Sequence, residues 1–159
     1  MNEEELKIVC SKIRHCLDQW STDGTLRTIA GREMNNFPNG CCGIVTECLA
    51  VILYKMTGTK PNMVTGECPS GHPNNGKLAA NSHAWIEING INIDLTGDQF
   101  NDGDIFIPPV WVSSSPHTLS NKMKITTKPA YLIGITKEAS GFDATQLRLI
   151  SELWNELKL

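Results

Sequence analysis

The sequence predicts an α+β fold in which a buried central helix packs against an antiparallel sheet, with further helices outside. Two patterns carry this prediction. An apolar helical period begins at Cys42, and two runs of alternating polarity are joined by Asn89-Gly90, which is typical of a two-residue β-hairpin. The 159 residues suit one compact domain that spans residues 1–159.

The N-terminal segment, residues 3–20, predicts an amphipathic helix. Glutamates at positions 3–5 lie in its first turn, where the helix dipole favours acidic side chains. Its apolar residues recur at helical spacing and are Leu6, Val9, Ile13, Cys16, Leu17 and Trp20. Residues 21–41 contain several glycines and Pro38, so we expect a loop there that leads to the next helix.

The next helix is predicted to run from about Cys42 to Tyr54 and to stop near Gly58. Its apolar residues follow the i, i+3, i+4, i+7, i+8 spacing of a stripe that faces a core, and they are Val45, Cys48, Leu49, Ile52 and Leu53. We therefore expect this helix to be largely buried.

Short strands are predicted after this helix. One covers residues 62–67 and is followed by a mobile loop rich in glycine and proline. One or two more fall within residues 104–112, and another within 130–135. The chain closes with a helix that Asp143 can cap, with Gln146 reaching back. The apolar face of that helix is made by Leu147, Ile150, Trp154 and Leu157.

The segment from Ser82 to Thr96 is the strongest hairpin signal. With a type I′ turn at Asn89-Gly90, Ile88 pairs with Ile91, and the register separates apolar from polar residues. One face carries Ala84, Ile86, Ile88, Ile91, Ile93 and Leu95, and the other carries His83, Trp85, Glu87, Asn92, Asp94 and Thr96. We expect the apolar face to meet the core.

On the polar face His83 and Asp94 become diagonal cross-strand neighbours, with Cα atoms roughly 7–8 Å apart, a span that a side-chain hydrogen bond can close. The carboxylate would fix the imidazole tautomer and leave the other ring nitrogen to take a proton from a thiol. That thiol would come from the pair Cys41-Cys42 at a helix N-terminus, where free backbone N–H groups acidify it. These residues predict a thiol enzyme of the acyl-transfer class.

The chain resembles, in three motifs, the transglutaminase-like branch of the papain-like cysteine enzyme superfamily. That family shows Gly-x-Cys opening a helix, then His-Ala-Trp-x-Glu, then Asp-x-Thr on the neighbouring strand. The corresponding segments here are Gly40-Cys41-Cys42-Gly43, His83-Ala84-Trp85-Ile86-Glu87 and Asp94-Leu95-Thr96. The match covers about residues 37–100, and it implies a papain-like fold whose central helix bears the nucleophile.

Carried over, the resemblance implies Cys42 as the nucleophile, His83 as base and then acid, and Asp94 as the orienting carboxylate. Cys41 is the reserve candidate for the nucleophile. The oxyanion of a thioester-forming step would be held by the backbone N–H of Cys42 and one side-chain donor, for which Asn36 matches the papain-type offset. The expected activity is attack on an amide of a protein or peptide, as a peptidase, glutamine deamidase or transglutaminase, without a cofactor. A role as a bacterial effector or toxin rests on family analogy alone.

The composition argues against several other classes of function. The net charge is −3 and the 14 basic residues are scattered, so no positive stripe favours a nucleic acid. No apolar run is long enough for a membrane span. Six cysteines without a secretion signal predict reduced thiols and a cytoplasmic protein, with signal-independent delivery to another cell left open. For His15 and His117 the sequence identifies no partner.

Two alternatives to an enzyme stay open. A non-catalytic binding or immunity module would keep the fold without the chemistry. A zinc-stabilised domain would combine Cys68 and His72, at Cys-x3-His spacing, with one of Cys42, Cys48 or His83. No second closely spaced ligand pair supports such a zinc site.

Overall fold

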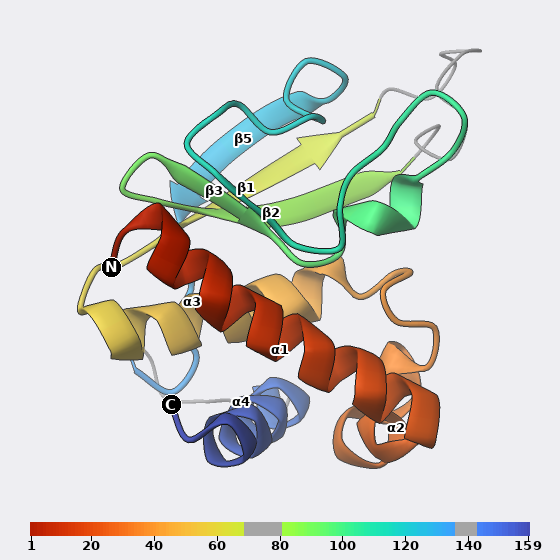
Figure 1. Ribbon diagram of the computed structural model, residues 1–159, viewed down its shortest axis with the longest axis vertical. Coiled ribbons are helices and arrows are strands. Elements are labelled where there is room, and N and C mark those ends of the chain that lie inside the picture. Colours follow the sequence, from red (N-terminus) through yellow and green to blue (C-terminus); the bar gives the residue numbers. More distant parts are fainter. Residues whose placement is uncertain (69–80, 136–142) are drawn as a thin grey trace.

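The computed structural model describes residues 1–68, 81–135 and 143–159. It is an α+β structure with two layers, an antiparallel sheet and a group of helices on one side of it (Figure 1). The helices are α1 (Glu3–Asp23), α2 (Thr25–Ala30), α3 (Cys42–Thr57) and α4 (Ala144–Leu157), with 3-10 turns η1 (Gly31–Met34) and η3 (Gly97–Phe100). The strands are β1 (Asn62–Glu67), β2 (Ser82–Ile88), β3 (Ile91–Asp94), β4 (Trp111–Ser113) and β5 (Lys124–Pro129), in the order β4-β3-β2-β1-β5.

The central element is α3, which packs against β2 on one side and α4 on the other. The predicted apolar stripe is buried, and so are Thr46, Ala50 and Val51, which makes α3 buried on most of its circumference. The helix runs past the predicted end at Tyr54 to Thr57. Gly58 then terminates it with φ of 69°, a left-handed conformation that glycine adopts without strain.

α1 begins with a capping box in which Asn2 and Glu5 each bind the other's backbone N–H, at 2.9 and 2.8 Å. The helix covers the predicted residues and continues to Asp23. Leu6, Ile13 and Leu17 are buried in the main core, as their helical spacing predicts. α1 is therefore the scaffold helix that the sequence suggests.

Residues 21–41, for which the sequence predicts a loop, contain helical structure. Gly24, with φ of 84°, ends α1 and begins α2, and η1 follows directly. Leu26, Ala30 and Met34 are buried at four-residue spacing. The glycines mark boundaries between short helical turns, because a left-handed residue both ends one helix and redirects the chain into the next.

The hairpin has the predicted register. Asn89 and Gly90 have φ of 51° and 79°, both in the left-handed region that a type I′ turn requires. The paired residues are Ile88 with Ile91, Glu87 with Asn92 and Ile86 with Ile93. The main core includes Ile86, Ile88, Ile93 and Leu95. The apolar face of the hairpin therefore meets the core as predicted.

The strand prediction for residues 104–112 is largely wrong, because only its end forms β4. The side chains of Asn101 and Asp102 form hydrogen bonds with backbone groups that, in a sheet, would pair with a neighbouring strand. Asp102 accepts from the N–H groups of Asp104 and Ile105, and Asn101 binds both the N–H and the carbonyl of Ile107. Local side-chain bonds thus replace a sheet ladder.

The strand predicted at residues 130–135 lies instead at residues 124–129, as β5. Ala130, Leu132 and Ile133 are buried in the main core. β5 is a mostly exposed edge strand that pairs with β1. Its polar composition gave a weaker apolar signal than the core residues that follow it.

α4 occupies the predicted segment without the predicted cap, since the Asp143 side chain makes no capping hydrogen bond. Gln146 instead donates to Glu47 of α3 at 2.9 Å. The fully buried face is made by Leu149, Ile150 and Leu153, whereas Leu147, Trp154 and Leu157 are partly buried. All four predicted residues therefore pack on the main core, and Leu149 and Leu153 widen the buried side of the helix.

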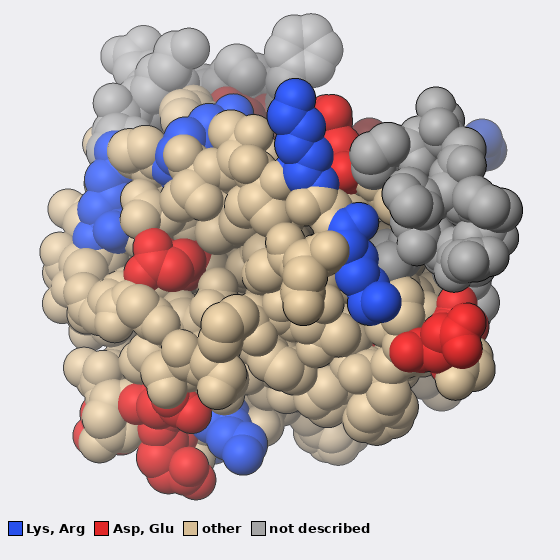
Figure 2. All heavy atoms as spheres, turned by 90° about the horizontal axis from the view of Figure 1, so that it is seen from above, with Lys and Arg blue, Asp and Glu red and all other residues tan. Residues whose placement is uncertain are grey.

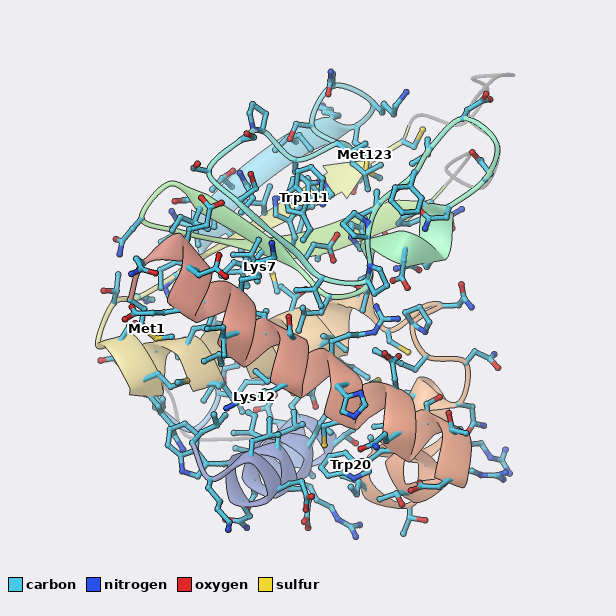
Figure 3. All side chains as sticks on the ribbon, viewed as in Figure 1. Met1, Lys7, Lys12, Trp20, Trp111 and Met123 are labelled. Atoms are coloured by element: carbon cyan, nitrogen blue, oxygen red, sulfur yellow. The ribbon has the colours of Figure 1, made fainter. Side chains whose placement is uncertain are left out.

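A second apolar cluster lies apart from the main core. Its buried members are Cys68, Phe100, Ile105, Ile107, Leu119 and Met123, with Trp111 packed against them. Figure 3 shows Trp111 and Met123 on the sheet side of the molecule and Trp20 among the helices. On the face seen in Figure 2, basic and acidic side chains are interspersed. Within the described ranges, none of the helices combines the length and the apolar character that crossing a membrane requires.

Candidate active site

Cys42 is the first residue of α3, and Cys41 is the N-cap. The Cys42 side chain is partly exposed. Its sulfur lies within hydrogen-bonding range of the His83 ring and of the backbone N–H groups of Ala84 and Gly43. Backbone donors from a helix N-terminus and from a strand thus converge on one sulfur, which favours the thiolate form.

Thr46 fixes the position of α3 against β2 one turn after Cys42. Its hydroxyl donates to the carbonyl of Ala84 at 3.0 Å, and both residues are buried. Because Ala84 follows His83 directly, this bond sets the distance between the helix that bears the thiol and the strand that bears the imidazole.

The diagonal pair predicted across the hairpin is present. Nε2 of His83 lies 2.7 Å from Oδ2 of Asp94, and the two residues are 1% and 2% exposed. The structure therefore brings together the three side chains that the sequence singled out, Cys42, His83 and Asp94. With Nε2 directed at the carboxylate, Nδ1 is the ring nitrogen left for the thiol.

Asp94 is enclosed by hydrogen-bond donors. Oδ2 is bound by His83 and also by Nε2 of His117, at 3.1 Å. Oδ1 accepts from the backbone N–H of Thr96 at 2.9 Å and from its hydroxyl at 3.3 Å. A Cβ atom at Gly97 would lie only 2.5 Å from Oδ2, so glycine is needed where the chain turns past the carboxylate.

Electrostatics favour charged forms of all three groups. Burial raises the pKa of Asp94, but the charge of His83 and the hydrogen bonds from His117 and His83 hold it well below its ordinary range. Burial lowers the pKa of His83, but Asp94 and then Cys42 raise it to about 9. Burial raises the pKa of Cys42, yet hydrogen bonding and charge from His83 bring it below its ordinary value.

The structure separates the two neighbouring cysteines. Cys41 is fully buried, and its thiol donates to the carbonyls of Asn39 at 3.4 Å and Glu33 at 3.6 Å, which would repel a thiolate. Burial, together with the nearby Cys42 charge, raises the pKa of Cys41 to about 11. Cys41 is therefore a poor nucleophile, and Cys42 alone faces the imidazole.

A residue that sequence reasoning missed, Gln99, lies beside the imidazole. Its Oε1 accepts from the backbone N–H of Gly40 at 3.1 Å, and its Nε2 donates to the carbonyl of Thr96 at 2.8 Å. These two bonds fix the orientation of the amide and do not use the second N–H group of Nε2. The Nε2 atom lies 3.5 Å from Nδ1 of His83. Asn36, the predicted side-chain donor, is exposed on the loop before α3.

Aromatic rings shield the buried pair from water. Phe100 meets the His83 ring edge-on at 5.0 Å between centroids, and Trp85 lies at 6.0 Å. His117 stacks on Trp85 at 4.5 Å with an interplanar angle of 20°. His117 was another missed residue, because it stands in a polar segment without any periodicity that would place it beside Asp94.

Among the side chains that the structure describes, no group of three or more histidine, cysteine or acidic residues is arranged to hold a metal ion. Cys48 lies in the core, where its thiol donates to the carbonyl of Gln146 at 3.6 Å. His72 lies outside the described residues, so the Cys68–His72 pair stays a prediction.

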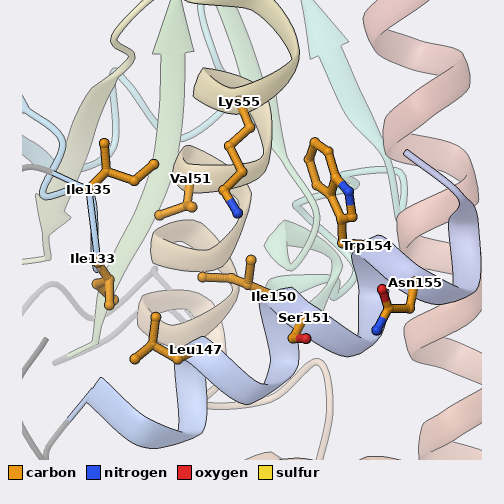
Figure 4. Close-up of a pocket in the computed structure, with 10 residues that line it drawn as sticks. Val51, Lys55, Ile133, Ile135, Leu147, Ile150, Ser151, Trp154 and Asn155 are labelled. Atoms are coloured by element: carbon orange, nitrogen blue, oxygen red, sulfur yellow. The ribbon is translucent and has the colours of Figure 1, made fainter.

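A pocket on the helical side of the molecule lies between α3 and α4 and is lined in part by Val51, Lys55 and Trp154 (Figure 4). Nζ of Lys55 lies 5.2 Å from the centroid of the Trp154 ring. The pocket contains none of the three residues Cys42, His83 and Asp94.

Comparison with protein-family models, with curated proteins and with solved structures finds no match for this chain.

Proposed function

We propose that the protein is a cysteine-dependent acyl-transfer enzyme that attacks an amide through a thioester at Cys42. The observation that supports this most strongly is the continuous chain of contacts from the Cys42 sulfur through the His83 ring to the Asp94 carboxylate. Such a chain activates a thiol and supplies a proton donor in one arrangement. The shifted pKa values of all three groups point the same way.

In the proposed reaction the Cys42 thiolate attacks the carbonyl carbon while the proton resides on Nδ1 of His83. His83 then delivers that proton to the leaving amine, which departs as the C–N bond breaks and leaves a thioester. Water or a second amine gives a proton back to His83 and attacks the thioester. This regenerates the Cys42 thiolate and releases an acid or a new amide.

The oxyanion formed during attack needs donors beside the sulfur. The backbone N–H of Cys42, at the start of α3, is one candidate. The second N–H of Gln99 Nε2 is the other, since the amide is fixed by Gly40 and Thr96 and lies next to the imidazole. Gln99 replaces Asn36 in this role because Asn36 is exposed on the loop before α3.

The resemblance to the transglutaminase-like branch of the papain-like superfamily makes this proposal more specific. Within the α+β architecture, a papain-like fold has its nucleophile at the start of a central helix and its histidine on the adjoining sheet. The proposed activities are those of a peptidase, a glutamine deamidase or a transglutaminase, with a protein or peptide as substrate. We also propose that the protein is synthesised in the cytoplasm. A role as a bacterial protein-modifying effector is a further proposal, drawn from the same family resemblance.

Alkylation by iodoacetamide tests whether the thiol is activated. At about pH 6 we expect Cys42 to react at least ~10-fold faster than free cysteine, because only the thiolate is nucleophilic and His83 stabilises it. Peptide mapping locates the label. Cys41→Ala is the matched control and should react like the wild type, whereas Cys42→Ala should lose the fast phase. Reaction of Cys42 at the rate of free cysteine would contradict the proposal and favour a non-catalytic binding module.

Intact-mass analysis of candidate proteins incubated with wild type and with Cys42→Ala distinguishes the three reactions. The mass shift of a glutamine converted to glutamate indicates deamidation, an amine adduct indicates transamidation, and fragments indicate proteolysis. Each change must be absent with Cys42→Ala. A modification that persists with this variant would show that another group performs it.

A further inference from the structure

Asp94 is bound by two histidines, although a thiol-imidazole-carboxylate arrangement needs only one. His83 and His117 approach the same oxygen, Oδ2, through their Nε2 atoms at 2.7 and 3.1 Å. Both rings are buried, with about the same exposed fraction of 1%. The hydrogen bond between His117 and Asp94 is therefore part of the protein interior.

The hydrogen bonds of His117 define its tautomer. Its Nδ1 accepts a hydrogen bond from the backbone N–H of Leu119 at 3.2 Å. A neutral ring with this bond carries its proton on Nε2. That proton is directed at Oδ2 of Asp94. His117 is thus a donor to the carboxylate, and its orientation is fixed by its own backbone segment.

Packing holds this donor in place. The His117 ring stacks on Trp85 and meets Trp111 at 5.2 Å between centroids. Trp85 in turn donates to Asn92 at 3.1 Å, and Asn92 donates to the carbonyl of Ser115, two residues before His117. The hairpin therefore positions the segment that carries the second histidine.

We propose that His117 is a positioning residue that limits the basicity of the Asp94 carboxylate, so that His83 can release its proton during the reaction. A carboxylate oxygen shared with a second N–H donor attracts the imidazolium less strongly than an unshared one. The positive end of the His117 N–H also lies close to the charged His83 ring, with ring centroids 6.4 Å apart. Both effects favour proton release by His83.

The other titratable groups near this pair are few. In the described residues, Cys42 of α3 faces the His83 ring. The Arg14–Asp98 ion pair lies next to Leu95, the residue after Asp94, because Arg14 also donates to the carbonyl of Leu95. The effect assigned to His117 is therefore separable from theirs by changing position 117 alone. This inference concerns the same site as the proposed function and rests on it for its catalytic meaning.

The test is an NMR titration of the His83 ring in protein labelled with 15N-histidine, with the signal assigned through His83→Gln. His117→Phe keeps a ring to stack on Trp85 but removes the donor, and His117→Gln removes the ring but keeps an N–H group that can reach Oδ2. We expect the midpoint for His83 to rise by about half a pH unit or more in His117→Phe and to return toward the wild-type value in His117→Gln.

A midpoint in His117→Phe that equals or lies below the wild-type value overturns the inference, because a merely structural role would loosen Asp94 and lower the His83 midpoint. An equal shift in both variants also overturns it. If His117→Phe does not fold, the wild-type spectrum still decides: the neutral His117 ring must show the proton on Nε2, and a proton on Nδ1 refutes the proposed donor. Absence of any imidazolium–thiolate signature in the wild type would instead refute the proposed function.

Discussion

At Cys42 two physical effects oppose each other. Removing the thiol from water disfavours the thiolate, and for Cys10 the same effect acts alone and raises the pKa to about 12. At Cys42 the His83 ring and the backbone N–H groups of Ala84 and Gly43 reverse the sign. The two cysteines differ in exposure, since Cys10 is buried and Cys42 is partly exposed, and they differ in partners. The partners reverse the direction of the shift, because burial alone would raise the pKa of both thiols.

Substitution of Cys42 should change how stability depends on pH. The pKa of His83 is raised from 6.5 to about 9 in the folded protein. Its stabilising contribution is complete below the unfolded pKa and is lost as the pH rises through the folded value. The lowered pKa of Cys42 acts in the opposite direction, because the folded protein releases that proton at lower pH than the unfolded chain. Both contributions stabilise the folded protein, but one falls and the other rises with increasing pH, so their pH dependences oppose each other in the wild type.

Cys42→Ser removes the Cys42 contribution and leaves only the part of the His83 shift that Asp94 causes, because both Asp94 and Cys42 raise the pKa of His83 in the wild type. We therefore expect its free energy of unfolding to fall relative to wild type by ~1–2 kcal/mol as the pH rises from about 6.5 toward 9. Urea unfolding under reducing conditions at several pH values measures this. Parallel curves for the two proteins across that window would show that the thiolate–imidazolium pair does not form.

Gln99→Met should slow acylation, because methionine matches the length of glutamine but cannot donate to an oxyanion. With p-nitrophenyl acetate as an acyl donor, we expect the acetylation rate of Cys42 to fall by ~100-fold or more. Alkylation by iodoacetamide, which forms no oxyanion, should change much less. Asn36→Ala is the control and should leave both rates unaltered; slow acetylation in that variant would return the donor role to Asn36.

At the scale of elements, the hairpin between β2 and β3 determines the site. Its register puts Asp94, the last residue of β3, across from Trp85, so that His83 lies diagonally across from the carboxylate. A slip of one residue would turn one of the two side chains to the other face of the sheet and break their hydrogen bond. The turn at Asn89-Gly90 fixes the register, and Gly90 also donates its N–H to Glu87 at 2.6 Å.

Gly90→Ala should destabilise the protein by ~1–2 kcal/mol, since a Cβ atom is unfavourable at φ of 79°. Gly103→Ala is a matched control, because Gly103 has open space around it and no left-handed φ. Thermal unfolding compares the two variants. An equal effect of both substitutions would mean that the turn does not constrain the hairpin.

At the scale of the whole molecule, Arg14 joins the helical layer to the loops beside the site. It is 6% exposed, forms a two-point ion pair with Asp98 at 2.8 Å, and donates to the carbonyls of Leu95 and Pro109. Asp98 belongs to η3, the turn that also carries Gln99. Arg14 therefore holds in place the segment between Asp94 and the proposed oxyanion donor.

Arg14→Met should lower the free energy of unfolding by ~3–5 kcal/mol, because it leaves a largely buried carboxylate and two carbonyls without their donor. Lys12→Met, an exposed change on the same helix, is the control and should have little effect. Urea unfolding measures both. A small loss in Arg14→Met would show that the loops are held by other contacts.

Local periodicity and the turn chemistry at Asn89-Gly90 were enough to predict the central helix, the hairpin register and the pairing of His83 with Asp94. The packing of α3 against β2 determines that Cys42 faces the imidazole while Cys41 is buried, and long-range contacts bring Gln99 and His117 to the site. Those residues come from segments without regular periodicity, and their positions depend on long-range packing and side-chain hydrogen bonds. A pattern of nearest neighbours along the chain contains no record of such contacts.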